Sequence, residues 1–442
     1  MAVPSLAQAR DPHVAPRPTP LARIAGLVTA YGPAAIIVTL PLEFTTRYTL
    51  QPVTRWVMVV VALAAAYEVV THRRTVTWPR TASAALLVAF VAFAVVSWAI
   101  ARPPGSLKQL GDTIVYPFVG LLIMNLVVTG DDHRRAWTAM LVSGLGVALV
   151  GLVLYLTHTT IWTPNPAVAN RLNITFADPN ITARFLTLVA AAAIMLFALR
   201  QAPAWLCAAT AFACAVVQPM TFSRSGLALF VVVALVAAAV VVDRRRALAF
   251  AACVLVVFAL STVVNPDTRQ RAMDAESTLA GLVGVSPQHG SQTGAAGGGD
   301  TFALQDNRRY LIAAGLQMFA DHPVVGVGFG AYQHSLVSTY KRFIPANVPN
   351  PDTVSHTAFV TVAAELGVAG LVLLFAFLLA LARDAYLARQ TVWALIPATL
   401  IVPIVLYSQF EGRLIEEPYL WVLLGLFYAG VRGRPRVSSH TM

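Results

Sequence analysis

Runs of about 20 apolar residues recur along almost the whole chain, and this pattern most restricts the folds open to it. A helix needs about 20 such residues to cross the hydrocarbon core of a bilayer. Twelve runs approach or reach this length, at residues 23–41, 54–71, 82–101, 112–129, 135–157, 178–199, 203–220, 226–243, 247–264, 356–382, 391–410 and 417–431. Only 12% of the residues are charged, against about 25% in soluble proteins. The sequence therefore predicts an all-α, polytopic membrane protein with about 12 transmembrane helices.

The apolar runs divide the chain into five predicted segments. These are a cytoplasmic tail at 1–22, nine spans within 23–264, a periplasmic loop at 265–355, three spans within 356–431 and a cytoplasmic tail at 432–442. The first 22 residues lack an apolar core followed by a small-residue cleavage site, so we expect the first span to act as its own insertion signal. The three cysteines fall inside predicted spans, where packing is the expected role: Cys207, Cys214 and Cys253.

Arginine and lysine in the short loops predict the orientation, because these residues favour the cytoplasmic side. With the N-terminus inside, 17 of the 31 Lys and Arg residues are cytoplasmic, including the clusters at 72–74 and 243–246, which we interpret as topology signals. Arginines at the opposite ends of the spans run against this preference, which favours ligand binding for them. The net charge of +11 is expected to combine contact with lipid headgroups and a basic periplasmic face.

The long predicted loop at 265–355 contains two different parts. Residues 290–300, GSQTGAAGGGD, predict a flexible linker. Residues 306–320 predict an amphipathic helix at the membrane surface, because apolar residues recur there at helical spacing: Leu311, Ile312, Leu316 and Phe319. The GVGFG run at 326–330 follows no strand and lacks a terminal GK[ST], so backbone bending is preferred over a nucleotide-binding loop.

Four segments in this order resemble a known family. They are TFADPNITA at 175–183, TFSRSGLAL at 221–229, DHPVVGVGFGAY at 321–332 behind a helix with Arg308, and the start of a span at His356. Together they are similar to the O-antigen ligase and polymerase superfamily of bacterial envelope glycosyltransferases. The resemblance covers about residues 170 to 410 and is closest to the O-antigen ligases.

This resemblance implies a GT-C-type membrane glycosyltransferase whose active site faces the periplasm at the bacterial inner membrane. Such an enzyme moves a glycan from undecaprenyl pyrophosphate to a lipid A core oligosaccharide, without a nucleotide sugar or a metal. The implied partners are therefore this donor, the lipid A core acceptor and membrane lipids, and no cofactor or nucleic acid is expected. Two relatives in the superfamily stay open as alternatives, an O-antigen polymerase and a protein O-oligosaccharyltransferase.

Arginine suits a pyrophosphate donor because guanidinium stays charged and binds oxygens in pairs. Arg224, in SRSG at the outer end of a span, and Arg308 are the first candidates. Arg309 would point about 100° away from Arg308 on a helix, so only one should face the site, and the family pattern favours Arg308. Arg184, shortly after DPN, is a further candidate, and snorkelling to the membrane surface is its alternative role.

His356 is the candidate catalytic residue, since a neutral imidazole can accept the proton of an attacking hydroxyl. Its alternative role is a helix cap. Glu365 lies nine residues later, on the opposite face of an ideal helix, so a structural hydrogen bond between spans is the expected role for it. A single displacement with one base predicts inversion at the anomeric carbon.

Other polar groups are interpreted more simply. Other histidines, His289, His322 and His334, do not form a metal set, and neither HExxH nor DxD occurs near the predicted site. In the last outer loop, Glu411, Arg413, Glu416 and Glu417 are expected to pair with one another, with shaping of the acceptor entrance as the alternative. A lipid-linked glycan transporter would show a similar number of spans, but it is expected to carry charges on broken helices and a repeat between halves, and neither is evident.

Overall fold

The computed structural model describes residues 19–43, 52–161, 171–176, 178–266, 268–269, 299–346, 348 and 354–432. For residues 299–308 and Glu411, only the backbone is considered. The described part is built from helices and contains no strand. The predicted flexible linker lies outside the described residues up to 298, whereas Gly299 and Asp300 already belong to a helix.

The helices follow the predicted apolar runs closely. In chain order they are α1 (Pro20–Thr39), α2 (Val53–Val70), α3 (Ala82–Ala101), α4 (Leu107–Leu126), α5 (Gly130–Leu156), α6 (Pro179–Ala198), α7 (Ala204–Val217), α8 (Arg224–Ala239), α9 (Arg244–Val264), α11 (Gly299–Asp321), α12 (Tyr332–Ser338), α13 (Ala358–Ala388), α14 (Val392–Glu411) and α15 (Pro418–Arg432). Each predicted span overlaps one of these helices, with bounds that differ by up to six residues.

The lengths of these helices match a membrane protein. Among the described residues, ten helices are long and apolar enough to cross a membrane. The ten include α7, which reaches 18 residues with the 3-10 turn Gln218–Thr221 that continues it. Two predicted spans fall short of this length, since α8 has 16 residues and α15 has 15. The prediction of an all-α, polytopic membrane protein is confirmed.

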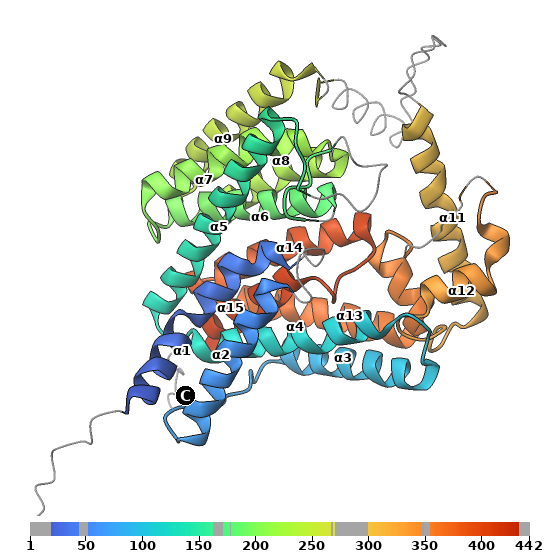
Figure 1. Cartoon of the computed structure of the whole chain (residues 1–442), viewed down its shortest axis with the longest axis horizontal. Helices are drawn as coiled ribbons and strands as arrows, with labels where there is room; N and C mark the ends of the chain where they lie inside the picture. The colour runs from blue at the N-terminus through green and yellow to red at the C-terminus, as the bar shows by residue number, and fades with distance from the viewer. Residues whose placement is uncertain are drawn as a thin grey trace, which may run out of the picture.

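Two helices, α6 and α15, form the centre of the molecule, because nearly all of their surface is apolar and is buried by other helices. All but three residues of α6 are buried, and α15 is buried from Pro418 to Gly430. The α4 and α15 backbones approach closely, since a Cβ on Gly425 would lie 2.6 Å from the Gly120 carbonyl oxygen. Figure 1 shows α5 running between the group of α1 to α4 and the group of α6 to α9, and α5 packs against α1, α6 and α7.

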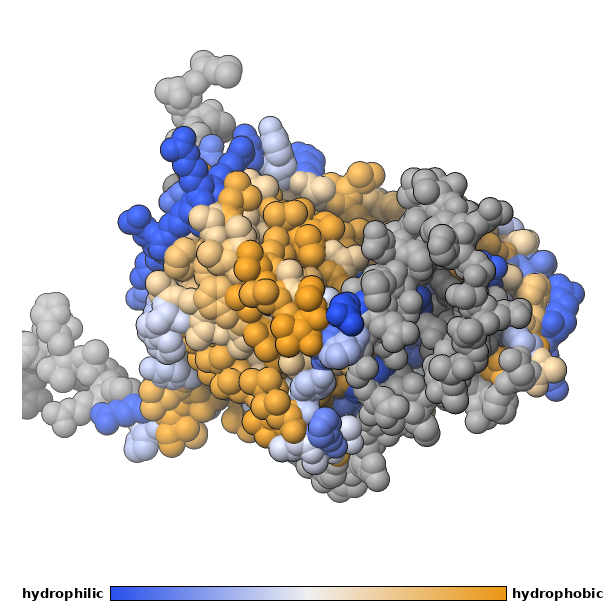
Figure 2. Space-filling view, turned by 90° about the horizontal axis from the view of Figure 1, so that it is seen from above, coloured by the Kyte–Doolittle hydropathy of each residue, from blue (hydrophilic) through white to orange (hydrophobic). Residues whose placement is uncertain are grey.

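The outer surface carries many large apolar side chains. Leu63, Ile100, Leu260 and Leu379 are each at least 59% exposed. Figure 2 shows one face of the molecule as a broad apolar area with hydrophilic residues on two of its sides. A surface of this kind is expected where helices contact lipid rather than water.

The segment between α9 and α13 packs on the main bundle through α11. Leu311, Ala314 and Met318 form the buried stripe of α11 and pack with Tyr332 and Leu336 of α12. The predicted helix is therefore present, and Leu311 is among the residues that it buries, whereas Leu316 is 51% exposed. Gly315 lies where α11 approaches α13, because a Cβ there would lie 2.7 Å from Val360 of α13.

The GVGFG run binds to a break in α13. The amides of Val327 and Gly328 donate to the carbonyls of Ala364 and Glu365, at 2.9 and 3.0 Å. In return, the amide of Val368 donates to the carbonyl of Pro323 at 2.8 Å. These exchanges require the non-helical Gly367, which has φ 62° and ψ −159°. We call residues 323–328 and 364–369 the backbone clasp, and it confirms backbone bending as the role of the glycines.

Candidate functional site

A cavity of about 250 Å³ lies where four parts of the chain meet. They are the first half of α4, the first turns of α6, the segment before α13 and the connection from α14 to α15. The lining side chains are mostly polar: Lys108, Asp112, Tyr116, Asp178, Asn180, Ile181, Arg184, His356, Phe410, Arg413, Glu416 and Glu417. All lie at span ends or loops that the sequence places on one side of the membrane, so we call this the outer cavity.

Arg184 reaches the outer cavity from α6. The helix starts at Pro179 behind Asp178, whose carboxylate accepts the Asn180 amide at 2.6 Å. The Arg184 side chain is only 2% exposed and forms an ion pair with Glu417. Snorkelling to the membrane surface is therefore excluded for Arg184, and Glu417 pairs with α6 rather than within its own loop.

Two carboxylates of the loop before α15 line the cavity, Glu417 buried and Glu416 half-buried. Burial raises the pKa of Glu417, and the Arg184 guanidinium partly offsets this effect. Burial also raises the pKa of Glu416, whereas Arg413 and a hydrogen bond with Gln109 act in the opposite direction. Arg413 is exposed, and it forms no ion pair within the part of the chain whose side chains are described.

A chain of ion pairs supports the α4 wall of the cavity. Asp112 accepts from Lys108 at 2.9 Å and from Arg55 at 2.8 Å. Arg55 also pairs with Glu43 at 2.7 Å, and the Tyr116 hydroxyl donates to the same carboxylate at 3.1 Å. Burial raises the pKa of Glu43, an effect that Arg55 opposes. Asp112 is thus shared by two cations, and Lys108, whose side chain is 73% exposed, keeps much of its surface open.

His356 lies in a tight bend directly before α13. Its φ of 57° falls in the left-handed region, which is uncommon for a residue other than glycine. The helix begins at Ala358 and its N-cap is Thr357, so the span starts two residues later than predicted and His356 is not the cap. The bend also depends on Gly412, where a Cβ would lie 2.8 Å from the His356 amide nitrogen.

Glu365 acts in the clasp region rather than beside His356. Its carboxylate accepts the amide of Tyr332, the first residue of α12, at 3.1 Å. The expected structural hydrogen bond is therefore present, but the partner is the backbone of the long segment instead of a second span. Glu365 lines a smaller cavity that shares Arg413 and Glu416 with the outer cavity.

Arg224 lies close to the outer cavity without lining it. It is the first residue of α8, half-buried, and follows the N-cap Ser223. The Ser223 hydroxyl donates to Asn180 Oδ1 at 2.8 Å, and Arg171 donates to the same oxygen at 3.1 Å. Because Asn180 lines the cavity, the start of α8 lies directly behind the part of the cavity wall that α6 forms.

The two adjacent arginines of the long segment lie on α11. Arg309 is exposed and does not belong to the described lining of the outer cavity. The backbone of Arg308 belongs to the same helix. Its side chain lies outside the described part of the structure. Of the five predicted site residues, the structure thus brings Arg184 and His356 together in one cavity.

Several lining residues were missed or undervalued by the sequence interpretation. Lys108, Asp112 and Asn180 were not proposed, and Arg413 was assigned to pairing. A usable signal was present for Lys108 and Arg413, because both are cations on the outer side of the predicted topology. Among the described residues, no three His, Cys, Asp or Glu side chains are grouped as metal ligands would be.

Comparison with known families agrees with the resemblance seen in the sequence. Residues 209–375 match a family model described as O-antigen ligase. This region runs from α7 into α13 and contains Arg224, the backbone clasp and His356. No curated protein matches the chain. This match of the segment 209–375 supports a relationship of the chain to the O-antigen ligase and polymerase family.

Proposed function

We propose that this protein is an O-antigen ligase that acts at the periplasmic face of the bacterial inner membrane. It transfers a glycan from undecaprenyl pyrophosphate to a hydroxyl of the lipid A core oligosaccharide. The observation that carries the proposal is the outer cavity, in which His356 and the buried Arg184 line the same space as Lys108 and Arg413. A histidine beside several cations suits a reaction between a neutral hydroxyl and an anionic donor.

The proposed reaction is a single displacement. The acceptor oxygen forms a bond to the anomeric carbon while the bond from that carbon to the pyrophosphate oxygen breaks. His356 takes the proton of the hydroxyl, and undecaprenyl pyrophosphate leaves with the electron pair of the broken bond. Attack from the face opposite the leaving group inverts the anomeric centre.

Cations are needed because negative charge grows on the leaving pyrophosphate. Guanidinium groups are suited to this, since they remain charged and form paired hydrogen bonds to phosphate oxygens. Arg184 is already oriented by Glu417. Lys108 and Arg413 have open side chains on the same cavity, and we assign them to donor binding together with Arg224, Arg308 and Arg309, which would act from α8 and α11.

The test is deletion of the gene followed by electrophoresis of both lipopolysaccharide and lipid-linked glycan. Loss of a ligase should leave long polymer on the carrier lipid and bare core on lipid A. Core that carries a single repeat would instead identify an O-antigen polymerase. Unchanged lipopolysaccharide with loss of glycan from proteins would indicate a protein O-oligosaccharyltransferase.

A further inference from the structure

A second polar site lies at the end of the bundle that the sequence places in the cytoplasm, away from the outer cavity. It is built around two residues. Asn125 is the penultimate residue of α4, and Thr77 lies in the connection from α2 to α3. Asn125 Oδ1 accepts the Thr77 amide at 2.8 Å and the Thr77 hydroxyl at 3.0 Å. Its side-chain amide donates to the carbonyls of Thr77 and Leu121 at 3.1 and 2.9 Å. Both ends of the Asn125 amide are therefore satisfied, which makes a fixed platform.

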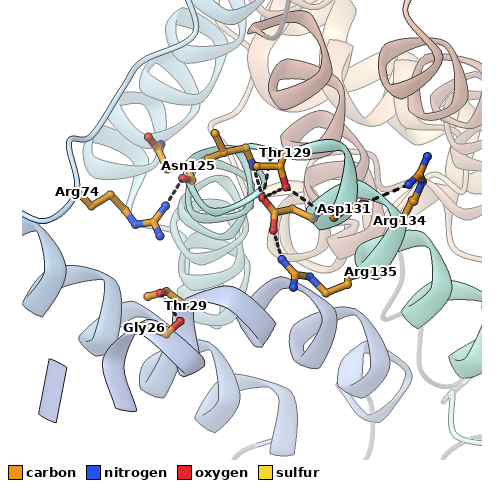
Figure 3. A network of polar contacts seen from close by, with 10 residues as sticks. Gly26, Thr29, Arg74, Asn125, Thr129, Asp131, Arg134 and Arg135 are labelled. Carbon is orange, nitrogen blue, oxygen red and sulfur yellow. Dashed lines mark hydrogen bonds and ion pairs between the residues drawn. The ribbon is translucent and has the colours of Figure 1, made fainter. Parts of the chain in front are cut away.

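Two arginines from distant parts of the chain converge on this platform. Arg74 donates to the Asn125 carbonyl at 3.1 Å, and its other side pairs with Glu68 at 2.8 Å. Arg432, the last residue of α15, donates to the Thr77 hydroxyl. Both guanidinium groups therefore contact the same pair of residues, since Asn125 and Thr77 are hydrogen-bonded to each other. Figure 3 shows Arg74 directed at Asn125, on one side of the turn that leads to Thr129.

The charges at this platform are not balanced. Glu68 neutralises Arg74, whereas Arg432 has no carboxylate within 4 Å among the described residues. The nearby acidic residues of α5 are engaged elsewhere: Asp131 pairs with Arg134, and Asp132 pairs with Arg135 and caps the helix through Thr129. Figure 3 shows Asp131, Arg134 and Arg135 on the opposite side of the turn from Arg74. The platform thus presents excess positive charge to an incoming anion.

The surroundings favour a lipid as the source of that anion. Thr77 points toward Asn125, while its neighbours Val76 and Trp78 are 51% and 65% exposed. Tryptophan is enriched at the boundary between hydrocarbon and headgroups. A free phosphate ion would gain nothing from this apolar rim, whereas a phospholipid would place its acyl chains against it.

We propose that Arg74 and Arg432, held on the Asn125 and Thr77 platform, bind the phosphate of an anionic phospholipid. The bound phosphate bridges the connection from α2 to α3 and the end of α15. It also supplies the negative charge that Arg432 lacks among the described residues. This site is separate from the outer cavity. It joins the connection from α2 to α3 to the end of α15.

The test is native mass spectrometry of the full chain in neutral detergent, titrated with phosphatidylglycerol or with phosphatidylcholine. We expect preferential binding of phosphatidylglycerol. Arg432→Gln should lower its apparent affinity about fivefold, which corresponds to about 1 kcal/mol for one arginine near a charged lipid surface. Because Arg74→Gln alone would strand the Glu68 carboxylate, the matching variant is Arg74→Gln with Glu68→Gln, and a similar loss is expected.

Arg389→Gln is the matched control, since Arg389 is an exposed arginine at the same predicted side that rests on Tyr386 instead of the platform. It should leave phosphatidylglycerol binding unchanged, and each variant should keep its thermal unfolding midpoint. Equal losses in the control and in Arg432→Gln would reduce the site to general charge attraction and overturn the proposal. Complete competition by inorganic phosphate would overturn the assignment to a lipid.

Discussion

At the scale of single residues, the backbone of His356 makes one substitution especially informative. Asparagine tolerates the left-handed region better than most residues, so it should keep the φ of 57° that His356 adopts. It cannot accept a proton at neutral pH. We therefore expect His356→Asn to fold normally and to lose transfer by about 100-fold to 10,000-fold, the usual contribution of a general base.

The measurement is glycan transfer by purified enzyme in lipid, with undecaprenyl-linked glycan and lipid A core as substrates. The control is Thr357→Ala, because Thr357 is the N-cap of α13 but its side chain makes no capping hydrogen bond. This variant should retain transfer. Near-normal transfer by His356→Asn would remove His356 from the role of base.

The pair formed by Arg184 and Glu417 allows structure and function to be separated. Removing one partner of a buried ion pair leaves an uncompensated charge and typically costs about 3–5 kcal/mol. Both Arg184→Met and Glu417→Leu should therefore lower the free energy of unfolding strongly. The double variant replaces the pair by apolar side chains and should recover most of the lost stability.

Transfer activity should stay absent in that double variant if Arg184 binds the donor. The unfolding midpoint in detergent reports stability, and the transfer assay reports function. A stable double variant with full activity would show that the ion pair serves packing alone.

At the scale of elements, the backbone clasp joins α13 to the segment before α12. A Cβ on Gly326 would lie 2.3 Å from the Glu365 carbonyl carbon, and Gly326 has φ 69°. Gly326→Ala combines backbone strain with overpacking, so we expect a loss of about 3 kcal/mol in unfolding free energy. Thermal unfolding in detergent measures it.

Gly105→Ala is the matched control for the clasp. Gly105 has φ 77°, but a Cβ there would meet no atom within 4 Å. This variant should cost only the strain of a left-handed residue, about 1 kcal/mol. If both variants lost the same stability, close contact in the clasp would not be the cause.

At the scale of the whole molecule, the testable feature is the orientation in the membrane. Reporters fused after Arg74, Arg135, Arg246 and Arg389 should give cytoplasmic signals, because basic residues hold these loops inside. A reporter inserted near Gly298 should give a periplasmic signal. A periplasmic signal after Arg246 would contradict both the predicted orientation and the number of spans.

The structure groups the charges at two separate places, whichever side of the membrane each faces. Residues assigned to the outer side meet in one cavity, such as Lys108, Arg184 and Arg413. Arg74 and Arg432, assigned to the inner side, meet on the Asn125 platform.

The sequence by itself determined the helices and revealed the resemblance to the O-antigen ligases. Transfer of an apolar side chain into lipid depends on the residue and its near neighbours, so runs of such residues mark helices such as α6 and α13 without knowledge of their partners. The glycines of the backbone clasp were also recognisable in the sequence, because a GVGFG run indicates a bend in the backbone. Local pattern also predicted α11, but its approach to α13 at Gly315 depends on the tertiary structure.

Only the tertiary structure decided which polar groups meet. Arg184 could have reached the membrane surface or a ligand, and its pairing with Glu417 depends on how α6 packs beside the connection before α15. The left-handed backbone of His356 likewise depends on Gly412 from another helix end. Charges in a membrane protein are costly unless they are paired or solvated, and a partner distant in the chain leaves no local mark in the sequence.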